Sequence, residues 1–202
     1  MRFVSLKTAG VVLAGGRSAR MGFDKALAPL AGRPLVAHVV ARLAPQVGAL
    51  FLNANGDAAR FASLRCAIVA DAAPSVGGGP LAGVAAALGY AQAQGFDWLA
   101  TAPCDAPFLP LDLVARLAAA AAQSRAPIAV AASAHGLEPM FALWSPALAG
   151  AVEAAAAAGD GGPRRLIARL GAAQAVFADA DADAFANLNT PEEFAAAQAR
   201  LG

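Results

Sequence analysis

Lysine is almost absent from this chain of 202 residues: only Lys7 and Lys25 occur, and every other Lys or Arg position is an arginine. Cysteine is equally scarce, and Cys66 and Cys104 are too few for a four-ligand zinc site. We expect both to be reduced thiols, with Cys104 lining a site without acting as its nucleophile. Because an ammonium is a compact, strongly hydrated charge and a guanidinium is a planar fork, a lysine in an arginine-rich chain suggests a specific contact.

Charge and long apolar runs are also limited. Charged residues make up 14% of the chain and the net charge is +1, so no basic stripe for nucleic acid is expected. Hydrophobic residues make up 58%, enough for a large core. No apolar run reaches the roughly 18 to 20 residues that span a bilayer, and the first residues lack the apolar centre of a signal peptide. We therefore expect a cytoplasmic protein with neither nucleic acid nor membrane as a partner.

Apolar runs of strand length alternate with helix-length patterns. The expected strands are Gly10–Ala14, Ala49–Asn53, Ala67–Ala70, Trp98–Ala102 and Ile128–Ala132, followed by Glu138–Trp144 and a strand near Ala175. The expected helices are Pro34–Leu43, Ala58–Ser63, Leu81–Ala93 and Leu111–Ala122, with later ones starting at Pro146, Pro163 and Pro191. This alternation predicts an α/β fold, a Rossmann-like, mostly parallel sheet with helices on both faces. No repeat or linker divides residues 1–202, so we interpret them as one domain.

Glycine or small polar residues follow the first four expected strands. The first strand runs into Gly15 and Gly16, the second ends at Asn53, and Asp71 and Asp105 follow the third and fourth. Each could be a simple turn former. In a parallel sheet, however, ligands bind beyond the carboxyl ends of the strands, so agreement on one edge favours a site.

The loop after the first strand combines two glycines with three cations, Arg17, Arg20 and Lys25. Consecutive glycines let backbone N–H groups approach a phosphate closely. The spacing fits neither the nucleoside triphosphate P-loop nor the dinucleotide fingerprint GxGxxG. The loop therefore predicts a phosphate contact of another type, the alternative being a Gly-rich connection with solvated cations.

The chain has four asparagines, in two pairs. Asn53 and Asn55, like Asn187 and Asn189, are two positions apart, a spacing that puts both amides on the same face of an extended segment. We expect Asn53 to contact a ligand, with Asn55 a weaker candidate because Asn-Gly also forms turns.

Three charged residues each allow more than one interpretation. Arg164 and Arg165 lie at an expected helix start, where a cation is unfavourable unless an anion is bound. They could contact an acceptor phosphate or be a solvated pair. Asp24 could pair with Lys25, orient the loop, or be surface charge.

The run Leu13-Ala14-Gly15-Gly16-Arg17-Ser18-x-Arg20-Met21-Gly22-x-Asp24-Lys25 resembles the signature loop of the nucleotidyltransferase superfamily. More narrowly, it resembles the MobA-type molybdenum cofactor guanylyltransferase family. The similarity continues along almost the whole chain, through the following segments: 52–55 (LNAN), Asp71, 79–83 (GPLAG), 103–107 (PCDAP) and 187–193 (NLNTPEE). The loop alone would indicate the superfamily only, whereas the ordered set is specific.

The resemblance implies a fold of the nucleotide-diphospho-sugar transferase type and a set of site residues. The implied GTP contacts are Leu13, Ala14, Gly15, Gly16, Lys25, Asn53, Asp71 and Asp105. Asp105 would bind Mg²⁺, and Lys25, Arg20 and Asp105 would be catalytic. From the residues themselves, Arg164, Arg165, Asn187 and Asn189 are the candidates for an acceptor site in the C-terminal part, the alternative for the two asparagines being scaffold behind it, while the N-terminal half binds the nucleotide.

The implied reaction transfers GMP from GTP to molybdopterin bearing molybdenum and releases pyrophosphate. Such a transfer needs no protein nucleophile, because a substrate phosphate attacks in line and the protein only positions and neutralises anions. A molybdenum insertion protein and recipient molybdoenzymes or their chaperones are further candidate partners.

Two alternatives remain open at this point. One is a molybdenum cofactor cytidylyltransferase on the same fold, although the resemblance favours guanine, since that relative more often has Ala-Gly in place of Gly15-Gly16. The other is a non-catalytic, nucleotide-responsive carrier of the cofactor, which would need Lys25 and Asn53 but not Asp105.

Overall fold

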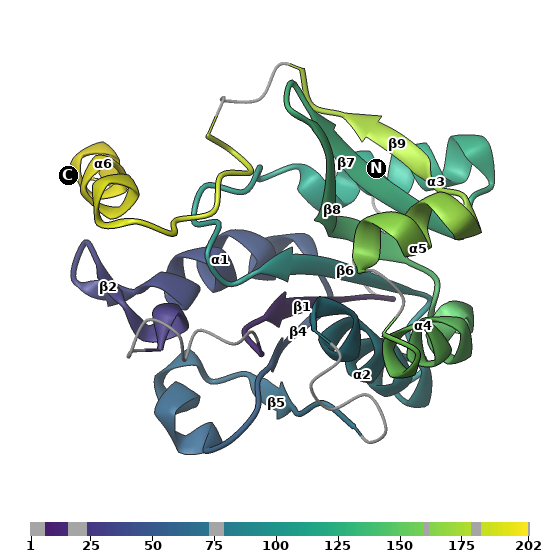
Figure 1. The fold of residues 1–202 in the computed structure, drawn as a ribbon, viewed down its shortest axis with the longest axis horizontal. Coiled ribbons are helices and arrows are strands. Elements are labelled where there is room, and N and C mark those ends of the chain that lie inside the picture. Colours follow the sequence, from purple (N-terminus) through teal and green to yellow (C-terminus); the bar gives the residue numbers. More distant parts are fainter. Residues whose placement is uncertain (1–6, 16–23, 73–78, 160–161, 179–182, 202) are drawn as a thin grey trace.

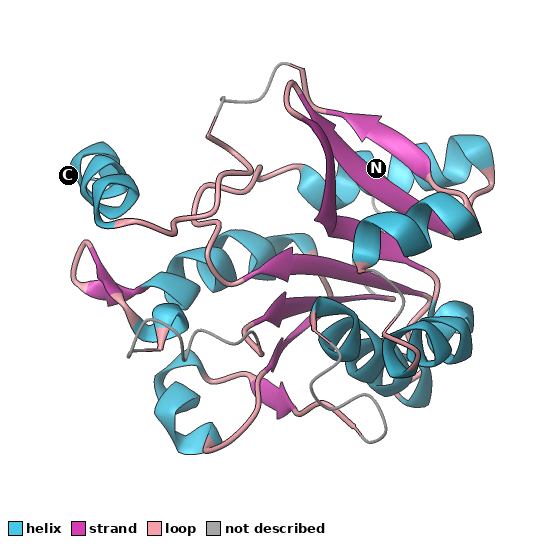
Figure 2. Cartoon of the chain, viewed as in Figure 1, coloured by secondary structure: helices cyan, strands magenta, loops and turns pink. Residues whose placement is uncertain are grey.

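A seven-stranded sheet forms the centre of the molecule (Figure 2). The computed structural model describes residues 7–15, 24–72, 79–159, 162–178 and 183–201. The strands of this sheet are β1 (Thr8–Leu13), β4 (Ala49–Asn53), β5 (Ala67–Val69), β6 (Trp98–Pro103), β7 (Ile128–Ser133), β8 (Gly136–Trp144) and β9 (Ala173–Val176). Their order is β5-β4-β1-β6-β8-β7-β9, and every neighbouring pair is parallel except those that involve β8. The predicted mostly parallel sheet is confirmed.

Helices cover both faces of the sheet, as predicted (Figure 1). They are α1 (Leu35–Leu43), α2 (Pro80–Ala93), α3 (Leu113–Ser124), α4 (Ala149–Ala157), α5 (Pro163–Leu170) and α6 (Pro191–Leu201). Side chains alternate along β1, so Val12 packs toward α1 whereas Val11 packs toward α2. None of the helices in the described segments is long and apolar enough to cross a membrane.

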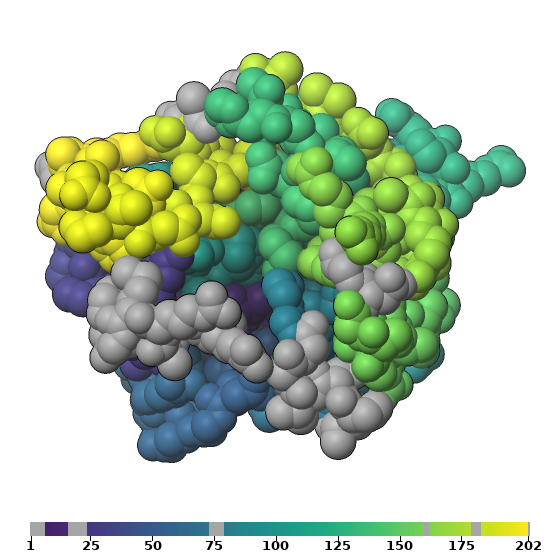
Figure 3. All heavy atoms as spheres, in the orientation of Figure 1, coloured from purple at the N-terminus to yellow at the C-terminus, as the bar shows by residue number. Residues whose placement is uncertain are grey.

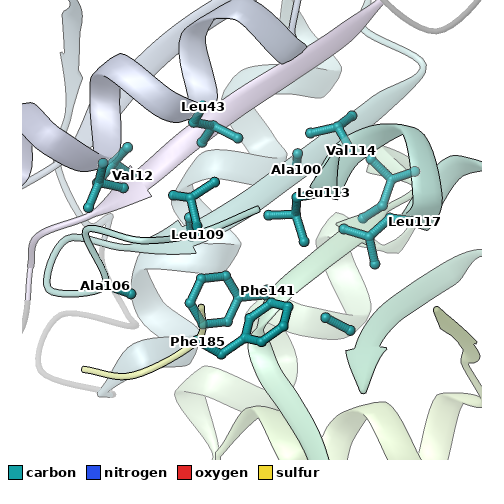
Figure 4. Close-up of a cluster of buried hydrophobic side chains, with 14 of the residues drawn as sticks. Val12, Leu43, Ala100, Ala106, Leu109, Leu113, Val114, Leu117, Phe141 and Phe185 are labelled. Carbon is teal, nitrogen blue, oxygen red and sulfur yellow. The ribbon is translucent and has the colours of Figure 1, made fainter. Parts of the chain in front are cut away.

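The core on the α1 and α3 face reaches into the C-terminal part of the chain (Figure 4). The rings of Phe141 and Phe185 meet edge to face, with centroids 4.9 Å apart. Leu109 and Leu113 belong to the same buried cluster. Residues near position 185 are thus anchored against the sheet before the chain continues to α6.

Several details differ from the sequence-based expectations. The helix expected from Pro146 begins as a 3₁₀ helix over Pro146–Leu148, before α4, and the helix expected from Leu111 begins at Leu113. A short hairpin, β2 (Pro29–Leu30) and β3 (Arg33–Pro34), was not expected, and its turn places Ala31 and Gly32 at positive φ angles of 47° and 73°. Pro34 therefore precedes α1 rather than beginning it. The segment expected as an α-helix over Ala58–Ser63 is a 3₁₀ helix over Ala58–Leu64.

The C-terminal helix packs on this hairpin rather than on the sheet (Figure 3). A separate small cluster joins Ala197 and Phe194 of α6 to Leu30 and Leu35. The Ala31 N–H donates a hydrogen bond to Gln198 Oε1 at 2.7 Å. The end of the chain thereby returns to its first third.

The fold predicts a large effect of losing one buried hydroxyl. Thr101 is fully buried on β6; its Oγ1 donates to the Met140 carbonyl at 2.9 Å and accepts the Trp144 indole N–H at 3.2 Å. Thr101→Val keeps the shape but leaves both partners unsatisfied, so we expect the free energy of unfolding to fall by about 1–3 kcal/mol. Urea unfolding measures this. Thr101→Ser, which keeps the hydroxyl, should lose less, and a valine variant as stable as the parent would contradict the assignment.

Candidate active site

Four parallel strands end together at one edge of the sheet. Leu13 on β1 pairs with Asn53 on β4 and with Pro103 on β6, and Asn53 pairs in turn with Val69 on β5. The residues that follow these ends therefore share an edge, as expected for a ligand site in such a sheet. They form two polar clusters, one on each side of the end of β1.

The first, called here the amide cluster, consists of Asn53, Asn55 and Asp71. The Asn53 amide donates to Asp71 Oδ1 at 2.9 Å and to the Val69 carbonyl at 3.0 Å. Asn55 donates to Asp71 Oδ2 at 2.8 Å, and its own Oδ1 accepts the Asp71 N–H at 2.9 Å. The Asp71 carboxylate is therefore held by both amides, in a fixed orientation.

Two glycines leave the space in which Asn53 lies. A Cβ at Gly15 would come within 3.0 Å of Asn53 Oδ1, and a Cβ at Gly83 on α2 within 2.3 Å of it. Asn53 is 1% exposed, and its Oδ1 accepts no hydrogen bond from the residues that the structure describes. The GPLAG segment thus has a packing role beyond starting a helix.

The second, the lysine cluster, consists of Lys25, Asp105 and Asn189. Lys25 Nζ donates to Asp105 Oδ2 and to Asn189 Oδ1, both at 2.6 Å. The Lys25 residue is 9% exposed, and its partners lie 80 and 164 positions away in the chain. Lys25 and Asp105 are together as predicted, but Asn189, expected at the acceptor, contacts Lys25 itself.

Cys104 lies beside this cluster as an inert thiol. Burial, and secondarily the negative charge of Asp105, raises the pKa of Cys104 to about 12. Burial also raises the pKa of Cys66. Both cysteines are free thiols, as expected, and at neutral pH neither supplies a thiolate nucleophile.

Arg60 connects the two clusters, and nothing in the sequence analysis pointed to it. Its guanidinium donates to Asp24 Oδ2 at 2.7 Å and to the Asn55 carbonyl at 2.6 Å. Asp24 also caps the 3₁₀ turn Lys25–Leu27 by accepting the Ala26 N–H at 3.1 Å. Of the three roles left open for Asp24, the structure supports orientation of the loop.

Some backbone groups near the end of β1 already form hydrogen bonds within the protein. The Ala14 N–H donates to the Asn53 carbonyl at 2.8 Å, and the Leu13 carbonyl accepts the Cys104 N–H at 3.1 Å. The Gly15 N–H donates to no described residue and so could meet a ligand. Gly16 and Arg20 lie outside the described residues, so their predicted roles stay predictions.

The residues expected at the acceptor do not gather in one place. The Asn187 carbonyl accepts from the Asn189 side chain at 3.2 Å. Arg164 on α5 donates to the Leu137 carbonyl at 2.8 Å, and Arg165 is exposed beside it. Figure 1 shows α5 and α6 well separated across the molecule. Asn187 and Asn189 therefore adjoin the lysine cluster, whereas the two arginines are associated with β8.

A hollow of about 630 Å³ opens beside the lysine cluster. Its walls come from the turn after Lys25 and from the start of α6, including Leu27, Pro29, Asn189 and Phe194. Most of these side chains are apolar, so a flat, partly apolar group could enter from this side.

The donors available for a metal ion are few and all oxygen. Among the described residues no group of three or more His, Cys, Asp or Glu side chains could hold one. The Asp105 and Asn189 oxygens nevertheless converge on one cation, the Lys25 ammonium. Such hard donors suit Mg²⁺, which takes one or two carboxylates and completes its shell with phosphate oxygens and water.

A mostly parallel sheet that carries amides, two carboxylates and one lysine at its carboxyl edge defines a nucleotide-binding α/β protein of the transferase type. The chain belongs to the MobA-like NTP transferase family, whose domain model matches residues 10–175. The resemblance noted from the motifs is thereby confirmed.

Similar proteins cover almost the full length. Relatives from Cereibacter sphaeroides and Rhodobacter capsulatus, each 46% identical, are named molybdenum cofactor guanylyltransferase. The matches cover 95% and 97% of this chain and 96% and 97% of the relatives. The crystal structure of molybdopterin-guanine dinucleotide biosynthesis protein A from Archaeoglobus fulgidus has a TM-score of 0.77 at 22% identity, over 96% of this chain and 98% of that one, and so shares the fold.

The space beside Asn53 predicts opposite effects of two glycine substitutions on α2. Gly83→Ala gains about 1 kcal/mol of helix propensity but puts Cβ against Asn53 Oδ1, displacing a buried amide whose hydrogen bonds are worth more in sum. We expect its melting temperature to fall. Gly89→Ala on the same helix meets nothing within 4 Å and should raise it. Thermal unfolding followed by circular dichroism compares them, and equal shifts would contradict the packing role.

Proposed function

We propose that the chain transfers GMP from GTP to the terminal phosphate of molybdopterin bearing molybdenum. The products are the guanine dinucleotide form of the cofactor and pyrophosphate. The observation that carries this site assignment is the contact of Lys25 Nζ with Asp105 Oδ2 at 2.6 Å, on the sheet edge that also holds the amide cluster. Relatives of 46% identity named for this activity support the substrates.

The transfer makes one bond to phosphorus and breaks one. An oxygen of the acceptor's terminal phosphate attacks the α-phosphorus of GTP, and the bond from that phosphorus to the bridging oxygen breaks in line. The electron pair of the broken bond leaves with pyrophosphate. Because both reactants are anions, catalysis depends on holding them in line and offsetting the charge that develops.

Within this proposal, the lysine cluster faces the phosphates and the amide cluster holds the nucleoside part. Lys25 would offset the charge on the phosphate oxygens, and the Gly15 N–H, which donates to no residue that the structure describes, would add a backbone donor. Mg²⁺ held by Asp105, with Asn189 as a further oxygen ligand, would neutralise phosphate charge. Arg20 would add a second cation, and Arg164 and Arg165 remain candidates for the far end of the acceptor.

The remaining parts of the proposal concern context. We treat residues 1–202 as one domain, with the nucleotide in its N-terminal half. Cytoplasmic location fits two free thiols. The protein would receive its acceptor from a molybdenum insertion protein. It would pass its product to recipient molybdoenzymes or their chaperones.

A comparison of nucleotides tests the proposed reaction. The protein is incubated with Mg²⁺, molybdopterin bearing molybdenum, and either GTP or CTP labelled at the α-phosphate. We expect label transfer and pyrophosphate release with GTP. Preference for CTP would overturn the choice of base, and binding without pyrophosphate release would overturn catalysis in favour of a carrier.

Asp105→Asn tests the carboxylate without emptying its place. Asparagine can still accept from Lys25, whereas Asp105→Ala leaves a buried ammonium uncompensated, a change that typically costs about 3–5 kcal/mol. We expect Asp105→Asn to fold and to lose about 10²–10³ in kcat, by analogy with other fixed electrostatic groups. Asp97→Asn, which removes an exposed partner of Lys7, is the matched control and should keep full activity. Near-normal turnover of folded Asp105→Asn would refute the role.

A further inference from the structure

The lysine cluster depends on where the chain places Asn189, which lies directly before α6. The side-chain Oδ1 of Asn189 accepts from Lys25 Nζ at 2.6 Å, and its side-chain Nδ2 donates to the Asn187 backbone carbonyl at 3.2 Å. Leu188, one residue earlier, donates its N–H to the Asp105 carbonyl at 2.9 Å. Two consecutive residues thus bind two members of the cluster.

The backbone of Asn189 is itself held by one side chain. Glu193 Oε2 accepts the N–H groups of Asn189 and of Thr190, the latter at 2.8 Å. In return, Thr190 Oγ1 accepts the Glu193 N–H at 3.2 Å. This reciprocal pair is a capping box, with Thr190 as the N-cap and Glu193 as the third residue of the helix. Here the box also includes the N–H of a residue that contacts Lys25.

The rest of α6 packs against the protein and so holds the capping box in place. Phe194 and Ala197 pack in the cluster with Leu30 and Phe108, and the Arg200 guanidinium lies 4.0 Å from the centre of the Phe108 ring. The pKa of Glu193 is lowered, first by the Asn189 N–H and then by the Thr190 N–H. The carboxylate is therefore ionised at neutral pH and keeps its acceptor role.

We propose that Glu193 is a positioning residue of the active site. By fixing the backbone of Asn189 through the N-terminus of α6, it holds the side-chain Oδ1 of Asn189 on the Lys25 ammonium and so sets the position of that charge. Glu193 makes no hydrogen bond to Lys25 or Asp105, and its hydrogen bonds reach the cluster through Asn189. The expected change in kcat rests on the proposed function, whereas the expected change in the surroundings of the Lys25 ammonium does not.

The kinetic test compares three variants. Glu193→Ala removes the acceptor and should lower kcat for GMP transfer about five- to tenfold, the factor to which the typical free energy of a helix-capping hydrogen bond converts. The KM for GTP should change less than twofold, because the amide cluster is untouched. Glu193→Gln keeps an acceptor oxygen, which a capping box also uses, and should restore most of the rate. Glu192→Ala removes the neighbouring exposed charge and should match the parent.

A second readout does not need turnover. Because Lys7 and Lys25 are the only lysines, ¹⁵N-lysine labelling gives two side-chain ammonium signals in nuclear magnetic resonance spectra. Glu193→Ala should shift the Lys25 signal and speed its hydrogen exchange, while the exposed Lys7 serves as the internal reference. Glu192→Ala should leave both signals unchanged, and Glu193→Gln should change the Lys25 signal less than Glu193→Ala does.

The pathway through Asn189 is tested by a double-mutant cycle. Once Asn189→Ala has removed the side-chain amide, Glu193→Ala should cause little further loss of kcat or change in the Lys25 signal. An equal loss in both backgrounds, or an unchanged Lys25 signal in Glu193→Ala, would overturn the proposal. If the parent transfers no GMP, the proposed function fails, while the lysine signals still decide whether Glu193 positions the cluster.

Discussion

The burial of one ammonium group constrains the rest of the structure. Lys25 is 9% exposed, and removing a charge from water costs several kcal/mol unless oxygen ligands replace it. Its two ligands come from the end of β6 and from the residue before α6. The C-terminal segment must therefore cross back over the sheet edge, and the cluster of Leu30, Phe108 and Ala197 holds it there.

In the amide cluster, too, a buried polar group needs partners that replace water, but here the donors are neutral amides. Asn53 is buried at the end of β4, so its amide hydrogens need acceptors, and Asp71 and the Val69 carbonyl supply them. The orientation this imposes turns Oδ1 toward Gly15 and Gly83, where only glycine leaves enough room. Arg60 then connects the Asn55 carbonyl to Asp24, beside Lys25. Strand ends thus fix one half of the site and loops fix the other, with one guanidinium between them.

The sequence was enough to predict the strands and the residues that meet at their carboxyl ends. The bounds of β4 were as expected, and Lys25 and Asp105 lie together because parallel strands end at one edge. The partners of Lys25 and Arg60 beyond that edge were not predictable from local patterns, since they lie 164 and 36 positions away. Glu193 is different, because Thr190-Pro191-Glu192-Glu193 is a capping box that the spacing of Thr and Glu already indicates. What the spacing could not reveal was that the preceding residue reaches a buried lysine.

Asp105 is the point at which these constraints meet. Its side chain binds the loop that carries Lys25, while its carbonyl binds Leu188 of the C-terminal segment. It follows β6, the strand at which the sheet changes from parallel to antiparallel pairing, and the buried Thr101–Trp144 hydrogen bond crosses that change. A shift at the end of β6 would therefore move the loop that carries Lys25 and the C-terminal segment together. Both anions of a transfer reaction need fixed positions. Because Asp105 contacts both the loop that carries Lys25 and the C-terminal segment, it fixes these two parts of the site relative to each other.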